Sequence, residues 1–150
     1  MDADTLLKSN GLPKRMVDTV SKAVRSRIMS RIRGKDTKPE LLFAKYLRSK
    51  GIKYRRNVRI QGHRVDFRLV GTKTVVFVHG CFWHGCPSCF RLPKSNRTFW
   101  SRKIELNKRR DFRLSSLLRK QGWLVRTVWE HAGRPGHRKI FIRSLKRAKQ

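Results

Sequence analysis

Residues 74–89 read Thr-Val-Val-Phe-Val-His-Gly-Cys-Phe-Trp-His-Gly-Cys-Pro-Ser-Cys. The stretch begins with Thr74 to Val78, a short run of apolar and β-branched residues that is typical of a buried central strand. It continues into a loop rich in cysteine and histidine, which we expect to extend from Gly80 to about Asn96. The stretch therefore predicts a central strand that leads into a chemically active loop.

Hydrophobic periodicity predicts further elements on both sides of this strand. Val65, Phe67 and Leu69 alternate with polar residues, so we expect them to share one face of a strand, with Asp66 on the other face. The other elements are a helix from near Thr37 to Gly51, strands at 54–60 and 123–129, a helix from about Thr98 to Gly122, and a basic helix at 138–149. This order predicts an α/β (α+β) fold, in which helices flank a mixed central β-sheet.

The chain is strongly basic, with 39 Lys and Arg residues against 9 Asp and Glu residues and a formal net charge of +30. Such a charge favours a polyanionic partner, and counterion release makes nucleic acid the expected one. A membrane surface is the rival partner, but the sequence has no long apolar run, basic amphipathic helix or lipidation motif. We expect a cytoplasmic, nucleoid-associated protein with a flexible basic arm at residues 1–20 and one domain at 21–150.

The three cysteines are clustered: Cys81, Cys86 and Cys89 have a C-x4-C-x2-C spacing. A tight, odd-numbered cluster indicates metal binding rather than disulfides, and zinc is the metal that such thiolates select. His131 is the best candidate for a fourth ligand, because the strand before it should lie beside the central strand. The alternatives are three reduced buried cysteines without metal, or a different fourth ligand, His84 or His63.

Two acidic residues have both a structural and a functional interpretation. Asp66 lies in the middle of a strand, where aspartate is disfavoured, between Arg64 and Arg68. It is either a salt-bridged surface residue or a Mg²⁺ ligand whose flanking arginines hold phosphate. Glu40 is either the glutamate of a capping box that begins at Thr37, or an active-site acid if this helix N-terminus points at the site.

The histidines and aromatic residues in and beside the loop also have both a structural and a functional interpretation. His79 and His84 lie where the chain leaves the central strand, close to the expected strand that carries Asp66. This position indicates general acid or base chemistry, although a lone histidine is usually structural. Phe82 and Trp83 would ordinarily be core residues. In a polar, glycine-flanked loop, however, they can form a wedge that separates base pairs.

Several stretches resemble the very-short-patch repair (Vsr) endonucleases, in the same order and over roughly residues 20 to 132. The most specific is the run from His79 to His84, His-Gly-Cys-Phe-Trp-His. The others are the motif from Arg25 to Glu40, Asp66-Phe67, Leu92-Pro93-Lys94-Ser95-Asn96 with Phe99-Trp100, and Val128-Trp129-Glu130. The resemblance implies a restriction-endonuclease-like core, Zn²⁺ for structure and Mg²⁺ for catalysis.

The resemblance also implies an activity, the nicking of duplex DNA on the 5′ side of the thymine in a T·G mismatch that arises when 5-methylcytosine deaminates. By motif, Asp66 resembles the metal-binding aspartate, and the Val78 carbonyl is a further metal ligand. His84 resembles the residue that activates water, and His79 and Glu40 resemble its active-site supporters.

Further residues match the DNA-binding part of the family pattern. Phe82, Trp83 and Trp100 match aromatic residues that intercalate beside the mismatch, and we expect Lys94, Arg64 and Arg68 to contact DNA as well. The expected pathway partners are a cytosine methyltransferase and a repair polymerase. Cys86 stands where several relatives carry histidine, and His131 where some carry cysteine, so the zinc ligands look like a rearranged Cys3His set.

Two other functions are compatible with these residues. A non-catalytic zinc protein that binds nucleic acid would need only the basic charge and the Cys3His set, but it leaves Asp66, His79 and His84 without a role. A Vsr-like restriction or homing nuclease that cuts intact sites would use the same motifs.

Overall fold

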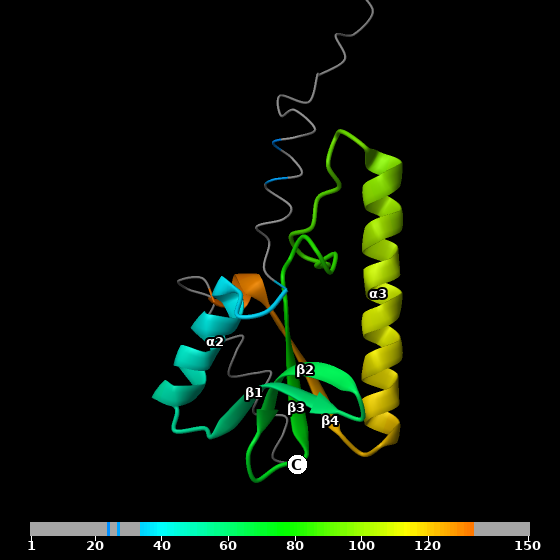
Figure 1. Ribbon diagram of the computed structural model, residues 1–150. Coiled ribbons are helices and arrows are strands. Elements are labelled where there is room, and N and C mark those ends of the chain that lie inside the picture. The colour runs from blue at the N-terminus through cyan, green and yellow to red at the C-terminus, as the bar shows by residue number, and fades with distance from the viewer. Residues whose placement is uncertain (1–23, 25–26, 28–33, 134–150) are drawn as a thin grey trace, which may run out of the picture. The chain divides into compact units, whose positions relative to one another are not determined.

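The computed structural model of the chain describes residues 34–133, together with residues 24 and 27. Its elements between residues 34 and 133 are helix α2 (Lys38–Ser49), strands β1 (Tyr54–Ile60), β2 (His63–Leu69) and β3 (Thr74–His79), helix α3 (Arg97–Lys120), strand β4 (Leu124–Trp129) and the short 3-10 helix η1 (Glu130–Gly133) (Figure 1). These bounds confirm the predicted elements to within one or two residues. The expected arm at 1–20 and the expected helix at 138–149 lie outside the described residues.

The four strands form one mixed sheet in the order β1-β2-β3-β4. The pairs β1–β2 and β2–β3 are antiparallel, whereas β3 and β4 are parallel and are connected through α3. Because β3 and β4 run in the same direction, with His79 beside Trp129, the residues after both strands emerge at the same edge of the sheet. The predicted fold class, a mixed sheet flanked by helices, is confirmed.

Apolar side chains pack on both faces of this sheet. Helix α2 contributes Phe43, Ala44 and Leu47, which are at most 1% exposed, to one cluster. Helix α3 contributes Leu118 to a second cluster, with Val75 and other apolar residues of the strands. The two helices thus cover the sheet on opposite sides and hold the ends of β3 and β4 in place.

Within the described residues, no helix has the length and apolar character that crossing a membrane requires.

Strand β2 differs from the sequence prediction at Asp66. Phe67 and Leu69 pack in the α2 cluster, but Val65 packs in the α3 cluster, so the three side chains do not share one face. The pairing of β2 is interrupted at this point: its register with β1 skips Asp66, opposite Asn57 with a positive φ of 49°, and its register with β3 comprises only Phe67 and Arg68.

Candidate active site and metal centre

The Asp66 carboxylate replaces a backbone partner between β2 and β3. Its Oδ2 accepts a hydrogen bond from the backbone N–H of Val78 at 2.9 Å, beyond the point where strand pairing stops. Burial raises the pKa of Asp66 to about 6, although the Val78 hydrogen bond and the charges of Arg64 and His84 act against this rise. A carboxylate that is both desolvated and held by the central strand is a suitable cation ligand.

Glu40 is the second acid of the site and is only 5% exposed. Its Oε2 accepts the backbone N–H of Asp36 at 3.0 Å, and its Oε1 accepts the Thr37 hydroxyl at 2.8 Å. The capping box predicted at Thr37 is therefore wrong in detail, because the threonine hydroxyl donates to Glu40 instead of accepting a helix N–H. The negative charge of Glu40 also raises the pKa of Asp66. A hard divalent cation such as Mg²⁺ would relieve this repulsion, so the two carboxylates fit a cation of that class.

His79 and His84 meet at the carboxyl end of β3. Their imidazole rings stack, with centroids 4.0 Å apart and ring planes 8° from parallel. The His84 Nδ1 lies 2.5 Å from Oδ2 of Asp111 in α3, a residue that the sequence analysis did not single out. Burial and the neighbouring His84 lower the pKa of His79 to about 4. The site therefore contains a half-buried, neutral imidazole beside an imidazole that a carboxylate orients.

Burial acts to raise the pKa of Asp111, but the hydrogen bond with His84 and the nearby positive charges outweigh it, so the net shift is downward. Asp111 is thus an ionised acceptor. An ionised carboxylate at Nδ1 favours the tautomer that carries its hydrogen on Nδ1, which leaves Nε2 of His84 as the lone-pair nitrogen.

Helix α3 also holds the loop that carries His84. The Asn107 amide donates to the Trp83 carbonyl at 2.8 Å. Gly85 has a positive φ of 59°, and a Cβ there would lie 2.4 Å from Cε of Lys108 and 2.8 Å from Cγ2 of Ile104. Only glycine permits both this left-handed conformation and so close an approach to the helix. The loop is therefore fixed on α3 on both sides of His84.

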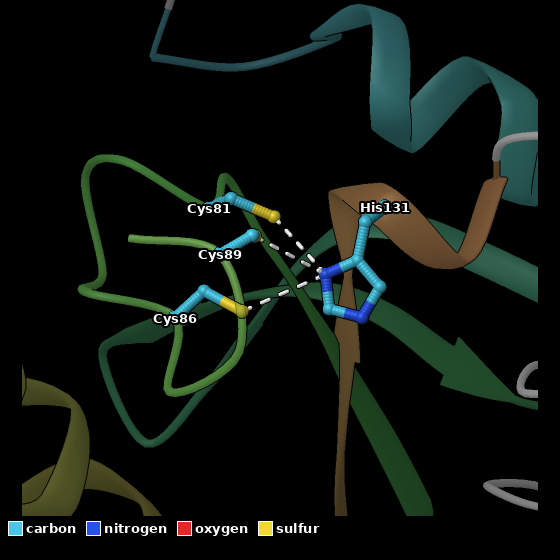
Figure 2. A group of neighbouring side chains, drawn as sticks. All are labelled: Cys81, Cys86, Cys89 and His131. Carbon is cyan, nitrogen blue, oxygen red and sulfur yellow. Dashed lines mark hydrogen bonds between the residues drawn. The ribbon is translucent and has the colours of Figure 1, made fainter. Parts of the chain in front are cut away.

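The four predicted zinc ligands converge in the structure. The Sγ atoms of Cys81, Cys86 and Cys89 lie 3.3, 3.5 and 3.6 Å from Nδ1 of His131 (Figure 2). One imidazole nitrogen has a single hydrogen or lone pair, so it does not form three hydrogen bonds at once. A tetrahedral zinc ion with about 2.3 Å to sulfur and about 2.0 Å to nitrogen separates each sulfur from the nitrogen by about 3.5 Å. The observed distances fit a shared zinc ion.

The strand topology explains this convergence. Cys81 follows β3 and His131 follows β4, and the two strands are parallel neighbours. The Glu130 carboxylate accepts the backbone N–H of Cys81 at 3.1 Å and ties the loop to the end of β4. The competing fourth ligands lie elsewhere, because His84 contacts Asp111 and His63 is exposed at the start of β2.

The aromatic residues of the loop form a partly exposed cluster with α3. Phe82 makes edge-to-face contacts with Trp83 and Trp100, at centroid distances of 5.2 and 5.0 Å. The Trp83 and Trp100 rings are 5.9 Å apart, and Phe99, next to Trp100, is 60% exposed. The structure thus gathers the three predicted intercalating residues next to His84, without burying them in either apolar cluster.

The three basic residues predicted to contact DNA are not all near this site. Arg64 is exposed, contacts the Gly34 carbonyl and acts electrostatically on Asp66. Arg68 instead pairs with Val75 and lies 5.5 Å from the Trp123 ring, near the start of β3 rather than the end that carries His79. Lys94 is exposed in the loop before α3. Of the three, Arg64 is the one whose charge acts on Asp66.

Comparison with known proteins identifies the family. The family model for the DNA mismatch endonuclease Vsr matches residues 17–91. The DNA mismatch endonuclease Vsr of Escherichia coli strain K12 is 39% identical over 132 residues, which cover 87% of this chain and 83% of the relative. The chain belongs to the Vsr family. It is therefore a Vsr-like endonuclease that acts on DNA.

Other similar proteins include nicking enzymes. The type II nicking enzyme V.NmeAIP of Neisseria meningitidis is 44% identical to this Vsr-family chain over 117 residues, which cover 77% of this chain and 83% of the relative. Among solved structures, the catalytic domain of the homing endonuclease I-Bth0305I matches with a TM-score of 0.49 and 23% identity, covering 76% of this chain and 93% of that domain.

Asp111 is the main residue of this Vsr-family site that sequence reasoning missed. It occupies the buried stripe of α3, seven residues after Ile104 and seven before Leu118, both of which are buried. An acid at heptad spacing on an apolar stripe needs a buried partner, and this was the available signal. Asn107, which holds the Trp83 carbonyl, had no comparable signal.

Proposed function

We propose that this chain nicks duplex DNA on the 5′ side of the thymine in a T·G mismatch, in a Mg²⁺-dependent reaction. The observation that carries the proposal is the group of side chains at the end of β3. There the half-buried Asp66 is held by the Val78 N–H, and His84 is oriented by Asp111. This arrangement lies beside a cluster of partly exposed aromatic rings.

The chain's own residues provide two of the functions that phosphodiester hydrolysis needs. Asp66, with the Val78 carbonyl and Glu40 nearby, would hold Mg²⁺, which when bound supplies Lewis acidity to the phosphate. His84 accepts a proton from water at Nε2, because its Nδ1 is engaged by Asp111. His79 stacks on the His84 ring and restricts its rotation. Both carboxylates are already ordered, so little reorganisation precedes the reaction.

The aromatic cluster supports selectivity for a mismatch. Phe82, Trp83 and Trp100 pack edge-to-face on one another, and Trp83 directly precedes His84 in the chain. A mispaired step costs less to unstack than a Watson–Crick step, so inserted rings discriminate between the two. The Cys3His group, which would hold Zn²⁺, fixes the loop that carries Phe82 and Trp83.

The test is a nicking assay on three otherwise identical duplexes with a T·G, T·A or C·G pair at one position, each strand labelled separately. We expect one nick, in the thymine strand of the T·G duplex and 5′ of that thymine, in Mg²⁺ but not in EDTA. Equal cutting of the C·G duplex would instead support a nuclease that cuts intact sites. Tight binding without any cutting in Mg²⁺ would support the non-catalytic zinc protein.

A further inference from the structure

Arg110 occupies a distinctive position at the edge of the site. Its neighbour Asp111 uses one carboxylate oxygen, Oδ2, for His84, and the other, Oδ1, lies 3.3 Å from Nη2 of Arg110. The Asp111 side chain is 19% exposed, whereas that of Arg110 is 67% exposed. Arg110 therefore touches the oriented acid with one end of its guanidinium while the rest of the group is open to solvent.

The charge of Arg110 acts on two groups of the site, Asp111 and His79. It lowers the pKa of Asp111, after the larger contributions from burial and the histidines, and it also contributes to the low pKa of His79. A guanidinium carries five N–H donors in a planar fork that matches a phosphate oxygen pair. The Asp111 contact occupies one Nη2 donor, so donors remain for a ligand that approaches His84 from solvent.

We propose that Arg110 binds the phosphodiester that is cut, by donating to a non-bridging oxygen of the phosphate next to His84. This inference rests on the proposed function for the identity of that phosphate. It assigns Arg110 a role in substrate binding, while the contact with Asp111 fixes where its guanidinium stands. An exposed arginine is common in a chain of net charge +30, so the argument depends on the position of Arg110 rather than on its charge.

The same helix provides a matched control. Arg109 is the preceding residue, and its side chain is 66% exposed. It pairs with Glu105 at 2.9 Å rather than with Asp111. Arg109→Gln and Arg110→Gln therefore remove the same charge from the same turn of α3, and only the second removes it from beside the His84–Asp111 pair.

Nicking of the T·G duplex in Mg²⁺ is the first measurement. We expect Arg110→Gln to lower kcat/KM by about 10- to 100-fold, the range for a lost charge-assisted hydrogen bond, mainly through KM. Arg109→Gln should stay within about threefold of wild type, because an exposed i,i+4 pair contributes little. Arg110→Lys should recover only part of the loss, since lysine keeps the charge but not the fork.

A binding cycle in EDTA is the second measurement and does not require activity. It compares wild type and each glutamine variant on duplexes that carry a single neutral methylphosphonate, placed in turn at each position around the mismatch. We expect one position at which neutralisation weakens binding by wild type and by Arg109→Gln, but much less by Arg110→Gln. Equal sensitivity of the two variants at every position would overturn the inference. If wild type does not nick the T·G duplex, the proposed function fails, and the binding cycle still decides whether Arg110 binds phosphate.

Discussion

The Sγ atom of Cys81 lies 3.3 Å from Nδ1 of His131, although the two residues are 50 positions apart in the chain. The parallel pairing of β3 with β4 creates this proximity, because each residue follows the end of one of these strands. A metal ion at this point would link the loop that follows β3 to the end of β4. The Cys3His group and the His79–His84 pair therefore depend on the same strand pair.

The first prediction concerns the content of this site. Elemental analysis should find about one zinc per chain, which suits a four-coordinate structural site. Cys86→Ala removes a ligand that is 2% exposed, so it should lower zinc content and the melting temperature together. His63→Ala is the control, because His63 is exposed and lies outside the group. Full zinc retention in Cys86→Ala would remove Cys86 from the ligand set.

The second prediction concerns the close approach of the loop to α3. Gly85→Ala should destabilise the protein by about 2–4 kcal/mol, because it adds left-handed strain and a clash with Ile104. Gly71→Ala isolates the strain alone, since Gly71 has a φ of 78° and open space around its Cβ position. It should cost only about 1 kcal/mol. Equal melting temperatures for the two variants would mean that the loop does not rest on α3.

The third prediction concerns Asp111. Asp111→Asn keeps the shape but removes the ionised acceptor at Nδ1 of His84, so the imidazole can present the wrong tautomer. We expect kcat to fall by about 100- to 10,000-fold while DNA affinity changes little. Glu105→Gln, an exposed acid on the same helix, should leave kcat unchanged. A kcat equal to that of wild type in Asp111→Asn would show that the His84 contact has no catalytic role.

Much of this structure could be predicted from local patterns, and the exceptions have physical causes. The strands were predictable because apolar runs and alternation specify them, and the Cys3His convergence followed from placing β4 beside β3. The face of Val65 was not predictable, because the interruption of strand pairing around Asp66 is a tertiary effect. Asp111 was missed because its partner, His84, lies 27 positions away and becomes a neighbour only when the loop rests on α3.

The fourth prediction separates a wedge from a core role for Trp83. Base–aromatic stacking is worth about 1–3 kcal/mol, so Trp83→Ala should reduce the preference for T·G over T·A duplexes by about five- to 100-fold. Overall DNA affinity at low salt should change less, since it depends on the basic residues. A thermal melt accompanies the cleavage assay. A lowered melting temperature with retained discrimination would mean that Trp83 is a structural core residue and not a wedge.

The most direct test of the hydrolytic site is Asp66→Asn. The asparagine amide oxygen can still accept the Val78 N–H, and it removes the repulsion with Glu40, so the fold and the zinc content should be retained. Affinity for the T·G duplex should stay the same or rise, because a negative charge beside the DNA is lost.

The measurement is single-turnover nicking in Mg²⁺ with all DNA bound. We expect a rate at least about 100-fold below wild type, because metal-assisted charge stabilisation is worth several kcal/mol. Nicking at the wild-type rate by a folded, DNA-bound Asp66→Asn protein would contradict the assignment of this site.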